Sequence, residues 1–374
     1  MAEVTLFFTV AAAIWIITLL LPWQPWRVRE VLDAPTALRD DYDVSDVTVL
    51  IPARDEAEVI GTTLASLKTQ GIGLQVVLVD DASSDATVEI ARQSGLEHLQ
   101  IVSVTDLPVG WSGKLWAQEQ GLRYVQTPLT LLLDADIELL PGIIYALKQK
   151  KHAENLHFVS LMAVLRFGSF WEKLLMPAFI HFFKMIYPFA LANNPNTKIA
   201  AAAGGCILVE TQALQAIGGM AVIKDAVIDD CTLAKAVKQA GYRIWVGLTH
   251  AVLSQRPYVT LGEIWEMVAR TAYTQLFYST LLLVFCTLIM ALMYIVPVIG
   301  IWAGDGMAFW AAFVALICML TAYLPTLNFY GLNLAWALSM PVIAILYLLM
   351  TWTSAWRYWQ GERSRWKGRV YQKD

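Results

Sequence analysis

The chain has 374 residues, of which 57% are hydrophobic and only 16% are charged. Soluble domains usually carry about 25% charged residues, so part of this chain is expected to lie in lipid. The net charge of −4 gives no support for nucleic-acid binding, and the four cysteines show no paired spacing. That cysteine pattern argues against a disulfide framework or a zinc site.

The first predicted element is an uncharged apolar run over residues 6–21, which flanking residues extend to the length of a membrane span. A cleaved signal peptide is the alternative, but no basic residue precedes the run and no small-x-small cleavage site follows it. Arg27 and Arg29 come after the run, and this charge bias indicates an anchor over residues 1–27 with the next domain in the cytoplasm. The polar residues 28–45 are interpreted as a linker.

Between residues 46 and 256, short apolar runs alternate with helical patterns. The runs are near-continuous Val, Leu and Ile, which is typical of strands buried on both faces. The alternation predicts an α/β domain with a mostly parallel sheet. The predicted strands are 47–51, 75–79, 100–104, 129–133, 158–164, 206–209 and 244–246, and the helices between the first strands are 56–70, 84–94, 113–125 and 141–150.

Two segments late in this region are candidates for the membrane interface. Residues 171–191 are apolar but are interrupted by charges and two prolines, so they are interpreted as an interfacial segment and not as a span. Residues 257–276 form a predicted amphipathic interface helix, because apolar side chains recur on one helical face. An ordinary helix packed on the sheet is the alternative for the second segment.

Three long apolar runs fill residues 277–356, and each is long enough to span a bilayer. A basic tail, residues 357–374, follows. Three full spans from a cytoplasmic catalytic domain would put this tail outside, against the positive-inside rule. We favour an internal tail, with one run re-entrant or lying flat, and the number of spans stays open.

Acidic and polar residues stand at the carboxyl ends of the predicted strands, where open α/β sheets bind ligands. Each group alone could be a helix cap or a solvated helix start. Their occurrence together, in order, indicates a functional site. The groups are Pro52, Ala53, Arg54, Asp55 and Glu56; Asp80, Asp81, Ser83 and Ser84; Asp134 and Asp136; and Asp229 and Asp230.

The spacing of Asp134 and Asp136 suits a hard divalent cation, because carboxylates two residues apart at a strand end point to the same side. Such a metal would neutralise a leaving diphosphate. Lys114 stands at a predicted helix start after a Gly-containing loop, where free N–H groups and a cation suit phosphate. A surface lysine is the alternative for Lys114. Asp80 is placed to bond a base or ribose.

These ordered motifs resemble the family 2 glycosyltransferases of the GT-A fold, over roughly residues 46–275. The resemblance implies that Asp80, Asp81 and residues 52–56 contact the nucleotide and that Lys114 approaches uridine diphosphate. It further implies that Asp134 and Asp136 bind nucleotide and metal.

The resemblance also assigns the acceptor side of the reaction. The family's acidic pair is normally Glu-Asp; here it is Asp229 and Asp230, so Asp230 is the predicted catalytic base. Gly204 and Gly205 match glycines of the acceptor region.

One departure concerns Arg270, the only residue kept from the Gln-x-x-Arg-Trp motif of processive and ceramide-type members. Arg270 is still expected to contact the diphosphate, but the loss weakens any expectation of ceramide specificity or chain extension. The anchor, the later apolar runs and the ending Trp366, Lys367, Gly368 and Arg369 resemble the hopene-associated glycosyltransferases and, more distantly, ceramide glucosyltransferase.

The expected activity is therefore inverting, metal-assisted transfer from a UDP-sugar to a lipid acceptor, with Mg²⁺ or Mn²⁺ as the metal. The resemblance to hopene-associated enzymes implies a hopanoid-related lipid as one candidate acceptor. The expected location is a bacterial inner membrane, with the catalytic domain cytoplasmic and no nucleic-acid partner. A processive polysaccharide synthase and a non-catalytic membrane scaffold are the alternatives.

Overall fold

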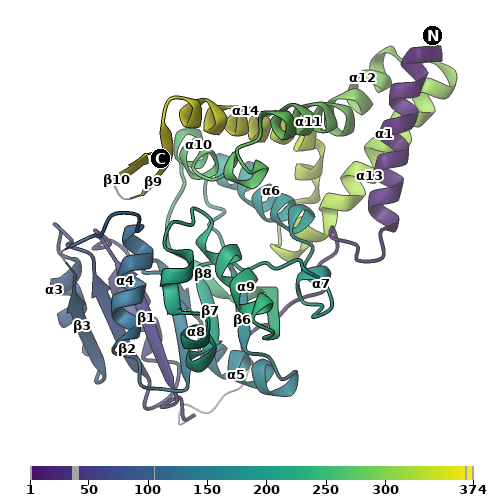
Figure 1. Ribbon diagram of the computed structural model, residues 1–374. Helices are drawn as coiled ribbons and strands as arrows, with labels where there is room; N and C mark the ends of the chain where they lie inside the picture. The colour runs from purple at the N-terminus through teal and green to yellow at the C-terminus, as the bar shows by residue number, and fades with distance from the viewer. Residues whose placement is uncertain (1, 36–41, 105, 367–368, 373–374) are drawn as a thin grey trace. The chain divides into compact units, whose positions relative to one another are not determined.

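The structure is a computed structural model that describes residues 2–35, 42–104, 106–366 and 369–372 (Figure 1). The predicted linker residues Asp40 and Asp41 and the tail residues Lys367 and Gly368 lie outside the described residues. The chain forms two compact units. The first comprises Met1–Arg29, Phe167–Pro188 and Tyr258–Asp374, and the second comprises Glu30–Arg166 and Phe189–Pro257.

The second unit is built on a mixed eight-stranded sheet with the order β3-β2-β1-β4-β7-β6-β8-β5. All strands run in one direction except β7 and β5, which are antiparallel to their neighbours. The predicted α/β class is thus confirmed. The strands are β1 (Val47–Ala53), β2 (Gln75–Asp80), β3 (Leu99–Ser103), β4 (Leu129–Leu133), β5 (Ile137–Leu139), β6 (Phe158–Val164), β7 (Cys206–Glu210) and β8 (Ile244–Ser254).

Successive side chains of the central strands enter two different cores, one on each face of the sheet. In β1, Val49 and Ile51 join one core and Leu50 joins the other. This explains the near-continuous apolar sequence, since both faces are covered. The first face is covered by α2 (Ile60–Leu67), α3 (Thr87–Arg92) and α5 (Ile143–Ala153), and the second by α4 (Gly113–Leu122), α8 (Thr211–Ala216), η1 (Gly219–Ile223) and α9 (Asp229–Gln239).

Two strand predictions differ from the structure. β5 was not predicted, because three residues are too few for a periodic signal. β8 runs for 11 residues instead of the predicted three, although polar Thr249 and His250 interrupt its apolar pattern. These two strands pair with each other, with Ile137 opposite Ser254.

The described part of the predicted linker is ordered against the second unit. The backbone N–H of Leu248 donates to Glu30 O over 2.8 Å, and Leu32 N–H donates back to Leu248 O over 3.0 Å. Val44 is fully buried. This part of the predicted linker therefore pairs with β8 in a strand-like manner.

The first unit holds the apolar helices. Three helical segments are long and apolar enough to cross a membrane, among the residues described: Thr280–Ala303, Gly306–Phe329 and Leu334–Trp359. The three predicted C-terminal runs therefore do form helices. The elements are α1 (Ala2–Leu20), α6 (Phe170–Ile186), α10 (Leu261–Ala269), η2 (Thr274–Leu276), α11 (Thr280–Met290), η3 (Ala291–Ile295), α12 (Val296–Ala303), α13 (Gly306–Phe329), η4 (Leu334–Ser339), α14 (Met340–Trp359), β9 (Glu362–Trp366) and β10 (Arg369–Gln372).

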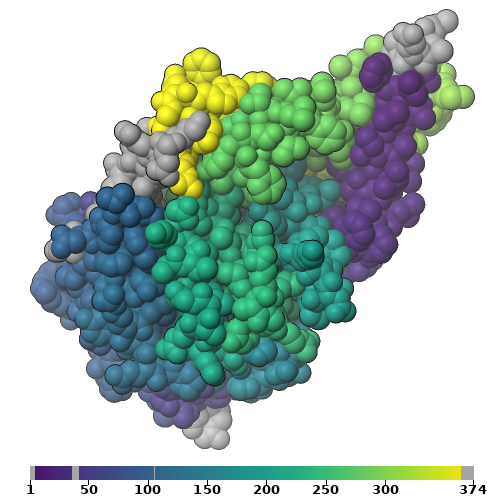
Figure 2. Space-filling view, viewed as in Figure 1, coloured from purple at the N-terminus to yellow at the C-terminus, as the bar shows by residue number. Residues whose placement is uncertain are grey.

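The first helix, α1, packs along α13, and the two ribbons lie side by side in Figure 1. In Figure 2, α1 is the purple surface. Phe8 lies in a small core with Ala308 and Ala312. Trp15 is fully buried, and its indole N–H donates to Met293 O over 2.8 Å. This helix is a packed member of the first unit, and its role as a membrane anchor stays a prediction.

The predicted interfacial segment 171–191 divides between the units, with α6 in the first and α7 (Phe189–Ala192) in the second. Two of the charges that interrupt α6 are buried: Glu172 and Lys184 are each 2% exposed. Glu172 forms a capping box with Ser169, and Lys184 Nζ donates to a backbone carbonyl of the same unit. These charges therefore satisfy backbone groups inside the unit.

The predicted amphipathic helix ends at Ala269, earlier than the sequence pattern suggested. Its Trp265 indole donates to Thr353 Oγ1 over 3.1 Å, and Glu266 pairs with Arg357. Both partners belong to α14, so α10 packs on a helix of its own unit. Its position in a membrane interface is a prediction that these contacts do not test.

Candidate active site

Lys114 lies between two of the predicted aspartates. It is the second residue of α4, whose first turn is capped by Ser112 Oγ accepting from Leu115 N–H over 3.3 Å. Its Nζ is 2.8 Å from Asp134 Oδ1 and 3.3 Å from Asp229 Oδ2. Burial alone would lower the pKa of Lys114, but the two carboxylates raise it above its ordinary value. Lys114 is therefore a fixed positive charge, in contrast to the solvated surface lysine of the alternative interpretation.

Asp230 occupies the first turn of α9 and is held by backbone donors. Its Oδ2 accepts from Gly204 N–H over 2.9 Å, and its Oδ1 accepts from Cys231 N–H over 2.7 Å. Burial, followed by the neighbouring negative charge of Asp229, raises the pKa of Asp230 to about 7. A carboxylate with a pKa near the working pH is suited to general base catalysis.

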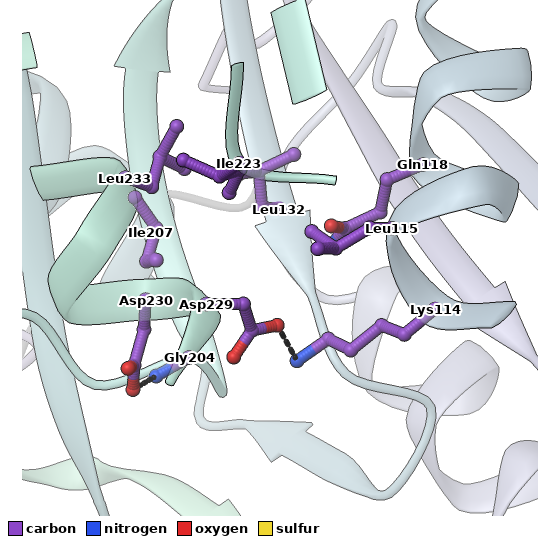
Figure 3. A pocket seen from close by; sticks show the side chains of 10 residues that line it. All are labelled: Lys114, Leu115, Gln118, Leu132, Gly204, Ile207, Ile223, Asp229, Asp230 and Leu233. Atoms are coloured by element: carbon purple, nitrogen blue, oxygen red, sulfur yellow. Dashed lines mark hydrogen bonds and ion pairs between the residues drawn. The ribbon is translucent and has the colours of Figure 1, made fainter. Parts of the chain in front are cut away.

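A cavity brings these groups together (Figure 3). Asp229 faces Lys114 across it, while Asp230 turns toward Gly204. Five apolar side chains and Gln118 form the remaining wall, so the charged groups lie at the edge of a mostly apolar surface, where their interactions are stronger than in water. The lining residues are Lys114, Leu115, Gln118, Leu132, Gly204, Ile207, Ile223, Asp229, Asp230 and Leu233.

The two predicted acceptor glycines occupy different positions. A Cβ on Gly204 would lie 3.4 Å from Lys114 Nζ and 3.5 Å from Asp230 Oδ2, so this backbone closely approaches the charged groups. Gly205 instead packs against Ile137, where a Cβ would meet its Cδ1 at 3.1 Å. Only Gly204 of the pair lines the cavity.

Asp134 and Asp136 follow β4, as predicted, but each faces a different cation. Burial raises the pKa of Asp134, Lys114 opposes that shift, and Asp136 adds to it. Asp136 Oδ2 instead accepts from Arg256 Nε over 2.9 Å. The guanidinium also reaches Glu56, with Nη2 2.8 Å and 2.9 Å from its two carboxylate oxygens.

Arg256 is a site residue that the sequence patterns missed. It stands two positions after β8, in a segment whose apolar pattern was expected to end at residue 246. A single arginine in an otherwise unremarked loop gives no local signal. A longer predicted β8 would have placed Arg256 at a strand end, beside the other charged groups.

The predicted nucleotide-contact segments lie at neighbouring strand ends. Pro52 and Ala53 complete β1, and the Arg54 guanidinium donates to Asp81 O. Asp80 Oδ1 accepts from Ser83 N–H over 3.2 Å, which fixes the loop after β2.

Side chains of the β1 and β2 loops cross-link them. Asp55 N–H donates to Ser83 Oγ over 3.0 Å, and Ser84 N–H donates to Asp55 Oδ1 over 2.7 Å. Asp55 and Ala82 both adopt positive φ, at 50° and 54°. Such conformations cost free energy in residues other than glycine and concentrate at functional sites. Ser83 and Ser84 thus join two loops and do not cap α3.

The carboxylates at β4 fit a metal that is shared with a substrate. Among the described residues no group of three or more His, Cys, Asp or Glu side chains is arranged to hold an ion. Mg²⁺ is commonly bound by one or two carboxylates together with substrate phosphates. Asp134 and Asp136 supply that donor set, so they fit a divalent ion that arrives with a diphosphate.

Arg270 belongs to the first unit, where it is the C-cap residue of α10. Its contact with a donor stays a prediction.

Residues 48–218 match the family model described as Glycosyl transferase family 2. The 4,4'-diaponeurosporenoate glycosyltransferase of Staphylococcus haemolyticus (strain JCSC1435) is 34% identical over 103 residues, covering 27% of this chain and 27% of that protein. The protein of the same name from Staphylococcus aureus (strain USA300) is 35% identical over 100 residues, covering 27% and 26%. The match thus spans about a quarter of the length of these curated relatives.

A similar solved structure is a mannosyltransferase from Pyrobaculum calidifontis in complex with GDP-Man and Mn²⁺. The TM-score is 0.53 at 19% identity, covering 94% of this chain and 99% of that one. At this identity the likeness establishes the fold alone, and it agrees with the mixed α/β sheet described above.

Proposed function

Because the chain belongs to the family 2 glycosyltransferases, we propose that it transfers a sugar from a UDP-sugar to a lipid acceptor. The observation that carries this proposal is the shared cavity of Lys114, Asp229 and Asp230. One positive group suited to a diphosphate and one carboxylate suited to a base line the same cavity. The proposed reaction uses both.

The proposed chemical step is a single displacement. Asp230 accepts the proton of an acceptor hydroxyl, whose oxygen forms a bond to the anomeric carbon. The bond from that carbon to the diphosphate oxygen breaks, and the diphosphate leaves with the electron pair. Attack from the face opposite the leaving group inverts the configuration. The Gly204 N–H keeps Asp230 Oδ2 in one orientation throughout.

Lys114 is proposed to bind the diphosphate. Its ammonium is held by Asp134 and Asp229, so little conformational entropy remains to be lost when a phosphate binds. A divalent ion bound with the donor at Asp134 and Asp136 would supply further positive charge to the leaving group. Asp80, Asp81 and the loop of Arg54 are proposed to hold the nucleoside.

The lipid character of the acceptor is supported by two observations. The first unit carries three helices that are apolar enough to span a bilayer. The relatives are named for 4,4'-diaponeurosporenoate, a lipid-like acceptor. The likeness of the anchor, the later runs and the tail to hopene-associated enzymes makes a hopanoid-related lipid the first acceptor to test. We place the enzyme in a bacterial inner membrane with its sheet domain in the cytoplasm.

Purified full-length protein in nanodiscs, supplied with labelled UDP-sugars and lipid extract, tests this function. A single-sugar glycolipid in the mass spectrum is the expected product, and the Asp230→Asn protein should not form it. A polymer would instead support the processive alternative. Donor hydrolysis and transfer both absent, across UDP- and GDP-sugars and lipid extracts, would contradict the proposal.

A further inference from the structure

Arg256 joins three segments of the second unit at the edge of the site. The preceding residue, Gln255, donates its N–H to Asp136 O over 2.7 Å, which fixes the end of β8 against the Asp136 loop. From this position Arg256 Nε reaches Asp136 Oδ2, and Nη2 reaches Glu56. Glu56 is only 9% exposed. A bridging guanidinium of this kind makes strong, directional bonds.

The two aspartates expected to bind a metal already have positive partners. Lys114 is 2.8 Å from Asp134, and Arg256 is 2.9 Å from Asp136. A divalent ion placed beside Asp136 would be repelled by the guanidinium at short range. The described residues offer no third acidic, histidine or cysteine ligand that could offset this repulsion.

We propose that Arg256 is a positioning residue that occupies Asp136 in the free enzyme and releases it only to a metal that arrives with the nucleotide diphosphate. The inference rests on the metal-assisted function proposed above. A diphosphate brings the negative charge that Arg256 and the metal both need. Metal binding is then coupled to nucleotide binding.

Glu56 keeps Arg256 at the site when the arginine releases Asp136. Arg256 contacts Asp136 through Nε and Glu56 through Nη2, which are different atoms of the guanidinium. The bond to Asp136 can therefore break while the bond to Glu56 remains. The arginine stays beside the site after release, where its positive charge can attract phosphate. Arginine remains charged at all physiological pH values, so the wild-type protein always carries this competing positive charge.

The test is the affinity for Mn²⁺, measured by electron paramagnetic resonance of free Mn²⁺ with the purified full chain. Wild-type protein should bind Mn²⁺ weakly alone and at least about tenfold more tightly with UDP or GDP, equal to about 1.4 kcal/mol. Arg256→Gln should bind Mn²⁺ without nucleotide at least about tenfold more tightly than wild type, because it removes the competing charge.

Two variants serve as matched controls. Arg256→Lys keeps the positive charge, so its nucleotide-free Mn²⁺ affinity should stay as weak as that of wild type. Combining Asp136→Asn with Arg256→Gln should remove the nucleotide-free binding that Arg256→Gln gains. A gain in affinity cannot come from misfolding, which would remove the site.

Three results would overturn the proposal: unchanged nucleotide-free affinity in Arg256→Gln, equal gains in the Lys and Gln variants, or wild-type Mn²⁺ affinity that is independent of nucleotide. The last needs no variant at all. Since no acceptor is present, this measurement is separate from the transfer assay. A failure to detect any transfer would contradict the proposed function but would not change the interpretation of the Mn²⁺ measurement.

Discussion

Gly204 donates its backbone N–H to Asp230 Oδ2 over 2.9 Å, and Lys114 Nζ lies 3.4 Å from the position that a Cβ on the same glycine would take. The proposed base and the proposed diphosphate-binding cation are thus placed around one residue. Asp229 completes the arrangement by pairing with Lys114. Substitutions of these residues are therefore expected to change catalysis and nucleotide binding in different ways.

Asp230→Asn should lower kcat by about 10²- to 10⁴-fold, because the amide cannot accept the acceptor proton. Binding of UDP should be preserved, since Asp230 is not assigned to the nucleotide. Single-turnover transfer measures the loss of catalysis, and titration with UDP measures whether nucleotide binding is preserved. Asp225→Asn, an exposed carboxylate upstream of α9, is the matched control and should transfer at the wild-type rate. Wild-type turnover in Asp230→Asn would remove the residue from the mechanism.

The pH profile should carry the signature of Asp230. A raised folded-state pKa means that the carboxyl is protonated, and inactive as a base, below about pH 7. kcat/KM should therefore fall about tenfold for each pH unit below that point. Asp229→Asn removes a like charge that raises this pKa, so its acid limb should move to lower pH. A profile that is flat from pH 5 to 8 would contradict the assignment.

Lys114→Met should weaken UDP binding about 10- to 100-fold, as expected for the loss of a hydrogen bond to a charged group. Lys150→Met is a suitable control, since Lys150 pairs with Glu154 on the surface of α5. Isothermal titration with UDP and with uridine distinguishes diphosphate binding from nucleoside binding. The affinity for UDP should fall, and the affinity for uridine should not change. Equal losses for uridine would point to a structural role.

Gly121→Ala tests the packing that positions α4 and hence Lys114. A Cβ there would lie 2.3 Å from Leu50 Cδ1 and 2.6 Å from Val79 Cγ2. Such overpacking typically costs about 1–3 kcal/mol, so the Tm should fall. Gly61→Ala in α2 is the matched helix control, with its nearest contact at an ordinary 3.4 Å. Thermal unfolding followed by circular dichroism compares them, and equal Tm values would refute the packing argument.

Local sequence patterns determined much of this protein. The runs that became β1, β2 and β4 were recognisable because strands buried on both faces need near-continuous apolar residues. The long C-terminal helices were equally evident, because length and hydropathy alone mark a candidate span. The aspartates at the strand ends could also be identified from the sequence, because each belongs to a motif only a few residues long.

Tertiary structure decided which of these charges meet. Arg256 lies 120 residues from Asp136 and 200 residues from Glu56 in the chain. They meet because β8 pairs with β5, a strand too short to predict. Lys184 of α6 is buried for the same reason: its partner, Arg27 O, lies 157 residues away, and helix packing brings the two together. A window of residues fixes periodicity and motif spacing, but the partner of a distant side chain depends on strand order and helix packing, which no short stretch encodes.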